Sequence, residues 1–269
     1  MPIDSPLFVS GSPSAARRLL LVSYWFPPAR TVGALRWQRM AHFAAERGWE
    51  LDVLSLHPDS AGQLDHAPLR ELPGGTRIYG VPGREHPLDR FERQALKVYR
   101  RFSVRSRGAT PAATNGDGEP AVSPTAGSLR VDEVRPWPRT VREMLRAYWS
   151  WIDYRRYLAW SGDVAQLAQR IVIPGTHRAV ITSAPPHPTH EAGRLISERT
   201  RLPFVMDMRD PWSLVQRVPE WLASPVFLRL GRHYESLAVA RASLVIANTE
   251  PFRAQLAERY PFAADRMTV

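Results

Sequence analysis

Short apolar runs and segments with helical periodicity alternate along most of this chain. Residues 19–26 form an apolar run, which is typical of a strand that helices cover on both faces. In residues 33–48, small and apolar side chains share one face at helical spacing, and Gly48 is well placed to end the helix. Residues 49–56 form the next apolar run, so the chain opens with the strand–helix–strand unit of a parallel sheet.

The alternation continues to the last residue. We expect further strands at 76–81, 178–183, 204–207, 243–247 and, as a beginning strand, 267–269. We expect further helices at 84–107, 139–160 with a continuation to 172, 187–199, 219–241 and 250–260. This order predicts an α/β fold, a Rossmann-like three-layer αβα domain with a mostly parallel sheet.

Composition along the chain suggests how this domain is delimited. Residues 1–16 are rich in Ser, Pro and Gly, which predicts a flexible N-terminal tail. Residues 17–266 carry the alternation and form the Rossmann-like domain. Within them, residues 108–128 have no aromatic side chain and Val122 as the only bulky aliphatic one. We therefore expect a disordered insertion at about 103–133.

The overall composition excludes several classes of protein. With 44% hydrophobic and 23% charged residues, the chain has ordinary globular proportions, not those of a globally disordered protein. The absence of cysteine excludes disulfides, thiolate metal sites and a cysteine nucleophile. The net charge of +10 favours anionic partners such as phosphates, nucleic acid or acidic lipids. No nucleic-acid-binding motif accompanies it, so nucleic acid is not an expected partner.

The sequence also bears on location. No run approaches the ~20 apolar residues that a membrane-spanning helix needs. Arg17 and Arg18 precede an apolar run, as in a signal peptide, but this run ends in Pro27 and Pro28 and has no small-residue cleavage site. We expect a cytoplasmic protein, and leave open a peripheral position on the inner face of the cell membrane.

Candidate chemistry follows three of the predicted strands, at the edge where parallel sheets bind ligands. The first candidate is Gly33, at the start of a helix whose free N–H groups could bind a phosphate. The alternative is that this glycine only fits a tight turn.

The second candidate is the loop with His187 and His190. These histidines have metal-ligand spacing, but no third ligand accompanies them, so we expect no metal. A histidine that lines the loop is one interpretation, and a helix start capped at Thr189 is the other.

The third candidate is the segment in which Asp207 and Asp210 flank Arg209 at the tip of a buried strand. A carboxylate there could accept a hydroxyl proton, and the arginine could hold a carboxylate or phosphate. An internal ion pair that makes the loop rigid is an equally good interpretation.

Four segments resemble the family 4 glycosyltransferases in order and spacing. They are Leu19 to Pro28 with Val32 to Trp37, Thr182 to Pro186 with His190, Pro203 to Trp212, and Ala247 to Glu250. The resemblance spans about residues 18–269 apart from the insertion. It implies the N-terminal, acceptor-side half of a GT-B architecture, in which two Rossmann-like domains face each other across a cleft.

The resemblance implies a hexosyltransferase-type enzyme that moves a sugar from a nucleotide-sugar co-substrate to a glycan or lipid-linked acceptor. Cell-envelope or exopolysaccharide biosynthesis is the implied setting. GT-B enzymes generally need no catalytic metal, so neither a metal nor another cofactor is expected. The family's donor signature, two glutamates separated by seven residues, has no counterpart here. Residues 267–269 would begin the missing donor domain, and we expect the isolated chain to be inactive.

The resemblance also assigns site residues. Asp207 is the candidate catalytic residue, for acceptor contact or proton acceptance. The substrate-binding candidates are Gly33, Arg36, His190, Arg209 and Asp210. We expect the strand tips at Gly33, His190 and Asp207 to share one crevice. The alternative function is a noncatalytic acceptor-binding module that works with a separate donor-domain chain.

Residues 135–160 combine many arginines with tryptophan and tyrosine. This composition is typical of a helix that lies on an anionic membrane. Because the aromatic residues occur nearly all round the helix, they could instead pack the domain core while the arginines face solvent. The sequence leaves both interpretations open.

Overall fold

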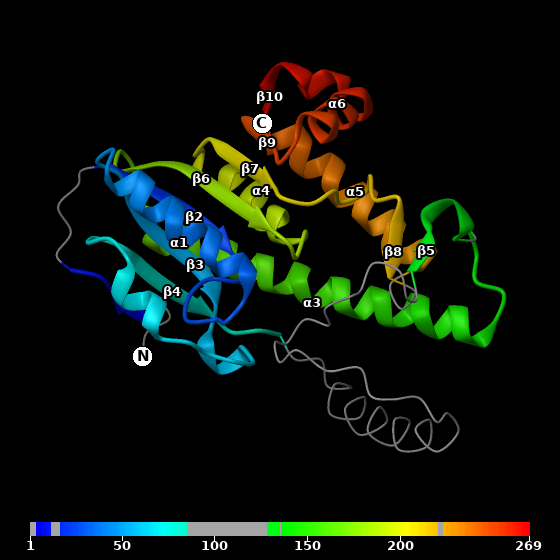
Figure 1. The fold of residues 1–269 in the computed structure, drawn as a ribbon, viewed down its shortest axis with the longest axis horizontal. Helices are drawn as coiled ribbons and strands as arrows, with labels where there is room; N and C mark the ends of the chain where they lie inside the picture. The colour runs from blue at the N-terminus through cyan, green and yellow to red at the C-terminus, as the bar shows by residue number, and fades with distance from the viewer. Residues whose placement is uncertain (1–3, 12–16, 85–127, 135, 220–222) are drawn as a thin grey trace.

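A single eight-stranded sheet organises the chain (Figure 1). The computed structural model describes residues 4–11, 17–84, 128–134, 136–219 and 223–269. The strand order is β1-β4-β3-β2-β6-β7-β9-β10, and every neighbouring pair is parallel except β1 with β4. The strands are β1 (Phe8–Val9), β2 (Arg18–Ser23), β3 (Glu50–Leu56), β4 (Arg77–Val81), β6 (His177–Ala184), β7 (Phe204–Met208), β9 (Leu244–Ala247) and β10 (Met267–Thr268).

Helices cover both faces of this sheet, so the predicted Rossmann-like αβα fold is confirmed. The α-helices among the described residues are α1 (Val32–Ala45), α3 (Val141–Ile171), α4 (Thr189–Thr200), α5 (Pro225–Arg241) and α6 (Glu250–Arg259). Short 3-10 turns are η1 (Pro58–Ser60), η2 (Ala67–Glu71), η3 (Val131–Glu133) and η4 (Pro261–Arg266). Of the described helices, none is long and apolar enough to cross a membrane.

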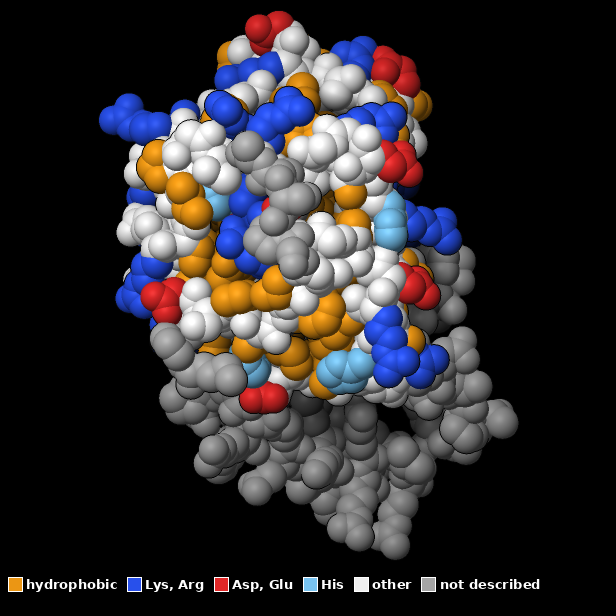
Figure 2. Space-filling model, turned by 90° about the vertical axis from the view of Figure 1, so that its left-hand side faces the viewer, with side chains coloured by type: hydrophobic (Ala, Val, Ile, Leu, Met, Phe, Trp, Pro, Cys, Tyr) orange, Lys and Arg blue, Asp and Glu red, His pale blue; other side chains and the backbone are white. Residues whose placement is uncertain are grey.

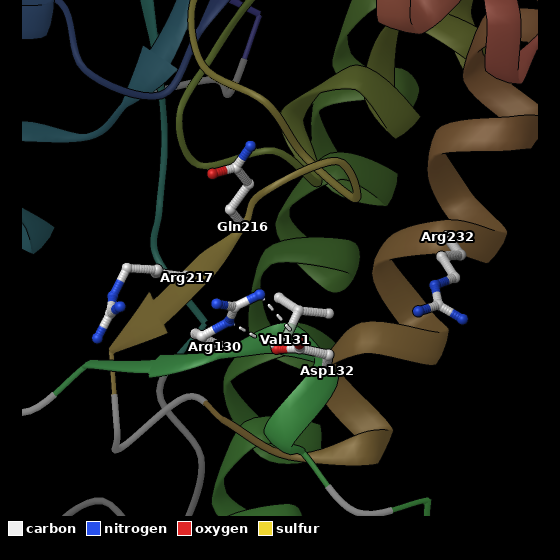
Figure 3. Close-up of a pocket in the computed structure, with 6 residues that line it drawn as sticks. All are labelled: Arg130, Val131, Asp132, Gln216, Arg217 and Arg232. Carbon is white, nitrogen blue, oxygen red and sulfur yellow. Dashed lines mark hydrogen bonds and ion pairs between the residues drawn. The ribbon is translucent and has the colours of Figure 1, made fainter.

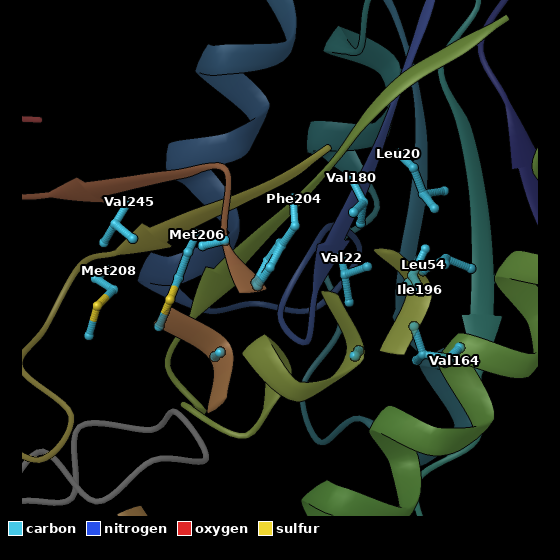
Figure 4. Packing of buried hydrophobic residues seen from close by; sticks show 14 of the residues in the cluster. Leu20, Val22, Leu54, Val164, Val180, Ile196, Phe204, Met206, Met208 and Val245 are labelled. Atoms are coloured by element: carbon cyan, nitrogen blue, oxygen red, sulfur yellow. The ribbon is translucent and has the colours of Figure 1, made fainter. Parts of the chain in front are cut away.

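The two faces of the sheet bury two separate apolar clusters. On one face, Phe204, Met206 and Met208 of β7 pack with side chains of α3 and α4 (Figure 4). On the other face, Leu21 of β2 packs against Trp37 of α1. Because successive side chains of a strand point to opposite faces, the alternate residues of β7 point toward the α1 face. This alternation decides to which face of the sheet each candidate residue on a strand points.

A second unit extends beyond the carboxyl ends of the strands (Figure 1). It consists of the first halves of α3 and α5 with a two-stranded antiparallel ribbon of β5 (Ser128–Arg130) and β8 (Arg217–Pro219). The side chain of Thr140 accepts a hydrogen bond from the Glu143 amide, a cap that starts the 31-residue α3. Val218, Ala223 and Leu228 form a small core under the ribbon.

The structure differs from the sequence-based predictions at several segments. Part of the expected tail is ordered, because β1 pairs with β4 at the edge of the sheet. Residues 128–133, placed in the expected insertion, form β5 and η3. The rest of the insertion and nearly all of the expected basic helix at 84–107 lie outside the described residues.

Two further differences concern strand and helix ends. The first strand ends at Ser23, before the two prolines at 27 and 28, which cannot donate to a sheet. Residue 219 ends β8, so α5 begins only at Pro225. The sequence predicts that residues 267–269 begin a following domain, but Met267 and Thr268 pair with β9 and so belong to this sheet.

A buried ion cluster joins four strands near their amino ends. The carboxylate of Asp52, which has no exposed surface, accepts hydrogen bonds from Arg18, Arg77 and His177. Burial by itself would raise the pKa of Asp52, but the hydrogen bonds from these three residues outweigh it and hold the pKa at about 2. Figure 2 shows the molecule from this end, where basic side chains are scattered among apolar ones. Positive charge therefore does not by itself mark a site.

Candidate functional site at the carboxyl edge of the sheet

Asp207 lies near the end of β7 and points toward the α1 face of the sheet. Its Oδ2 accepts a hydrogen bond of 2.8 Å from the Ser183 hydroxyl, on the neighbouring strand β6. Its Oδ1 accepts one of 3.0 Å from Nη2 of Arg36, which lies in α1. Asp207 is only 3% exposed, whereas the Arg36 side chain is 43% exposed. The carboxylate is thus buried, whereas the guanidinium is accessible from solvent.

Gly33 and Arg209 approach each other in front of this pair. A Cβ atom built on Gly33 would lie 3.0 Å from Nη1 of Arg209, which is closer than nearly all real contacts of a Cβ. Glycine at this position therefore permits the close approach of the guanidinium to the first turn of α1. The Arg209 side chain is half-buried and forms no ion pair with the described residues.

The first turn of α1 offers its N–H groups without competition from side chains. Thr31 is the residue before the helix, but its hydroxyl does not cap it, and no acidic residue lies in the first turn. Oγ1 of Thr31 is buried and has no hydrogen-bond partner among the described residues. An open helix N-terminus beside two guanidinium groups favours the binding of an anion.

Asn248, directly after β9, is the last side chain that joins this site. The side-chain amide of Asn248 donates a hydrogen bond to the backbone carbonyl of Arg209 and thereby holds the loop that follows β7. Asp210 is exposed in this loop. Ser183 and Asn248 belong to segments that resemble family 4 glycosyltransferases, but no pattern in the sequence singles them out. Their signal was only their position directly after, or at the end of, a predicted strand.

His190 does not belong to this cluster, contrary to our expectation of a shared crevice. Its ring has no exposed surface, and Nδ1 lies 2.7 Å from the Thr182 hydroxyl. Thr182 precedes Ser183 in β6, so it points to the α4 face while Ser183 points toward α1. Gly33 and Asp207 therefore converge, whereas His190 is buried on the other side of the sheet.

The neighbouring histidine is part of the same buried packing. The His187 ring stacks on Trp212 with the centroids 5.5 Å apart, and Trp212 in turn donates a hydrogen bond to the Tyr154 hydroxyl. Burial lowers the pKa of His187 to about 4 and that of His190 well below its ordinary value. Both rings are neutral at neutral pH. The described residues contain no group of three metal-ligating side chains.

A separate hollow lies between the β5–β8 ribbon and α5 (Figure 3). Its volume is about 650 Å³, and its lining residues are Arg130, Val131, Asp132, Gln216, Arg217 and Arg232. The Arg130 guanidinium is paired with Asp132 at 3.0 Å, as the dashed lines show. The sequence does not predict this hollow. Residues 130–132 are expected in the insertion, residues 216 and 217 lie between predicted elements, and residue 232 is expected in a helix.

Comparisons with known proteins give matches among solved structures. No family model matches the sequence, and no curated protein matches it. Among solved structures, the chain is similar to the crystal structure of LpCGTa in complex with UDP, with a TM-score of 0.44 and 14% sequence identity. The match covers 93% of this chain and 51% of that one. This chain thus spans about half the length of that structure.

Proposed function

We propose that this chain is the acceptor-side half of a GT-B glycosyltransferase that resembles family 4. It transfers a sugar from a nucleotide-sugar to a glycan or lipid-linked acceptor, and it needs a donor-binding domain to do so. The cluster of Gly33, Arg36 and Arg209 contacts the diphosphate of the donor. Asp210 hydrogen-bonds the acceptor.

One observation carries this proposal. The four segments that resemble the family are spread over more than two hundred residues of sequence, yet one residue of each lies in a single cluster. Arg36, Ser183 and Asp207 are joined by hydrogen bonds. Asn248 is joined to the same loop through the Arg209 carbonyl. Segments that served only the fold would not need polar side chains that meet at the ligand-binding edge.

The chemistry of the cluster fits the leaving group of glycosyl transfer. Departure of a nucleoside diphosphate develops negative charge on phosphate oxygens, and preorganised cations and N–H groups lower the barrier to it. Arg36 and Arg209 supply the cations, and the first turn of α1 supplies the N–H groups. Because the Asp207 carboxylate is only 3% exposed and already accepts hydrogen bonds from Arg36 and Ser183, we propose that it positions Arg36 rather than accepting a proton.

Calorimetric titration with inorganic pyrophosphate tests the binding part of the proposal. The Arg36→Gln and Arg209→Gln variants should each bind about tenfold more weakly than the unmodified chain, because each loses a charge-assisted contact. Arg178→Gln is the matched control, since Arg178 is exposed near the amino end of β6. Equal weakening by all three substitutions would mean diffuse attraction to positive charge and would refute the site.

A second test concerns catalysis. The coding sequence that follows the Val269 codon should encode another Rossmann-like domain with two glutamates separated by seven residues. If it does not, the noncatalytic acceptor-binding module that works with a separate donor chain becomes the better explanation. Transfer of labelled sugar by the isolated chain would refute that module and also our expectation that a donor domain is required.

A further inference from the structure

The N-terminal half of α3 exposes a stripe of large apolar side chains. Val141, Met144, Tyr148 and Trp151 follow each other at intervals of three, four and three residues, which places them on one face of the helix. Their exposed fractions are 67%, 51%, 42% and 44%. We call these four residues the α3 stripe. Isolated exposed apolar residues are common, but an ordered row of four on one helix face indicates an interaction surface.

The opposite side of this half of α3 is already occupied. Ser150 and Tyr154 are buried, and the Tyr154 ring packs against Phe227 of α5. The Arg146 guanidinium donates to the Ala223 carbonyl before α5. The helix therefore uses one side to pack against the domain, and the α3 stripe lies on a side that the described residues leave exposed.

The charges beside the α3 stripe are positive. Arg155, one turn after Trp151, is exposed, and its guanidinium lies 5.6 Å from the centre of the Trp151 ring. The acidic residues of this half of the helix are occupied. Glu143 accepts hydrogen bonds from the backbone at the start of the helix, and Asp153 pairs with Arg156 at 3.0 Å.

We propose that the α3 stripe docks on an anionic membrane surface, with the helix lying in the plane of the lipid headgroups. Tryptophan and tyrosine prefer this depth because their rings are apolar and their N–H or O–H groups need water. Arginine beside them meets the lipid phosphates. A second copy of this chain is the less favourable occupant, because each copy carries a net charge of +10 and repels another. The inference concerns binding alone and holds whether or not the chain transfers sugars.

Co-sedimentation of the full chain with vesicles of 30% phosphatidylglycerol in phosphatidylcholine tests the inference. The variant Met144→Gln, Tyr148→Gln, Trp151→Gln keeps good helix formers at exposed positions, and circular dichroism checks that it folds. Its partition into the vesicles should fall at least about tenfold, because the buried apolar area is lost. Phe262→Gln, at an equally exposed aromatic residue far along the chain, should leave the partition unchanged.

Charge is tested by a second pair of variants on the same helix. Arg155→Gln should weaken vesicle binding more than Arg170→Gln, because Arg170 is exposed at the other end of α3. Equal binding by the triple variant and the unmodified chain would overturn the proposal. So would a stable dimer in analytical ultracentrifugation that the triple variant abolishes, combined with no vesicle binding, since the stripe would then join two copies.

Discussion

Arg36 and Asp207 lie 171 positions apart in the sequence, yet Nη2 of the one is 3.0 Å from Oδ1 of the other. The pair joins α1 to the end of β7, at the edge where Rossmann-like sheets bind ligands. Its two members differ in exposure, so they should differ in what a substitution does. We expect the buried aspartate to contribute mainly to stability and the exposed arginine mainly to the proposed binding.

Arg36→Gln should lower the free energy of unfolding by less than about 1 kcal/mol, since a half-exposed ion pair contributes little. Asp207→Asn should cost about 1–3 kcal/mol, because it disturbs two hydrogen bonds to a buried group. Both should weaken pyrophosphate binding. Urea unfolding and calorimetry of the two variants and of the double variant measure this. If the binding losses simply add, Asp207 does not act through Arg36, and the positioning role is refuted.

Gly33→Ala should weaken pyrophosphate binding about tenfold without destabilising the fold. The added Cβ lies 3.0 Å from Nη1 of Arg209, and that flexible side chain can move away, but it then leaves its place beside the helix N-terminus. Gly162→Ala is the matched control, because Gly162 is also helical and nothing lies within 4 Å of its added Cβ. The control should gain about 0.5–1 kcal/mol of stability and bind normally. Normal binding by Gly33→Ala would argue against the close approach.

Gly193→Ala should destabilise the domain strongly. Its Cβ would come within 3 Å of Thr182 on β6 and of the buried Phe204 ring on β7. Neither group can move without disturbing the core between α4 and the sheet, so we expect a loss of about 3 kcal/mol or more. Thermal and urea unfolding measure the loss. A variant as stable as the unmodified chain would mean that α4 packs differently on the sheet.

The α/β alternation could be predicted because it depends on local pattern. β2, β6 and β7 are apolar enough to be recognised as buried strands, and the order of the helices follows. β1 and β5 could not be recognised, since each has at most three residues and is stable only through pairing with a distant strand. Their partners, β4 and β8, become known only when the chain is folded.

The site was predictable in its members but not in their arrangement. Sequence position indicates that Asp207 and His190 follow strands at the same edge, but not which face each side chain meets. Successive residues of β6 point to opposite faces of the sheet and so place the two side chains apart. Thr182 contacts His190 on one face, and Ser183 contacts Asp207 on the other. Whether a carboxylate is buried or exposed also depends on packing against α1, which no local pattern contains.

The half-buried His187 should make the fold sensitive to mild acid. Because the pKa of His187 is lowered to about 4 by burial, the folded state keeps it neutral while the unfolded state protonates near pH 6.5. The contribution of the neutral His187 ring to the free energy of unfolding is therefore fully present above pH 6.5. It is lost as the pH falls toward 4, and the loss amounts to up to about 3 kcal/mol. His187→Phe keeps the stacking on Trp212 and should reduce this slope. Urea unfolding between pH 8 and 4 measures the slope, and an unchanged slope would contradict a neutral His187 ring in the folded state.

The ion cluster around Asp52 should make the stability of the fold depend on pH in a lower range than His187 does. Its folded pKa of about 2 lies below the ordinary value of 3.8, so the carboxylate contributes stability above pH 3.8 that is lost as the pH falls through 2. Asp52→Asn should remove about 2 kcal/mol at neutral pH and flatten the acid transition in this range. Asp59→Asn, at an exposed carboxylate, is the control and should change neither. If the Asp52→Asn variant still shows a steep acid transition, other titrating groups cause that transition.

The proposal that the carboxyl edge binds a diphosphate is tested most directly by mapping amide chemical shifts of the labelled chain during titration with inorganic pyrophosphate. We expect saturable shifts to concentrate at residues 31–36, at Arg209 and Asp210, and at Asn248. Shifts that concentrate instead at Arg130, Arg217 and Arg232, around the separate hollow, or that spread over all exposed arginines, would contradict it.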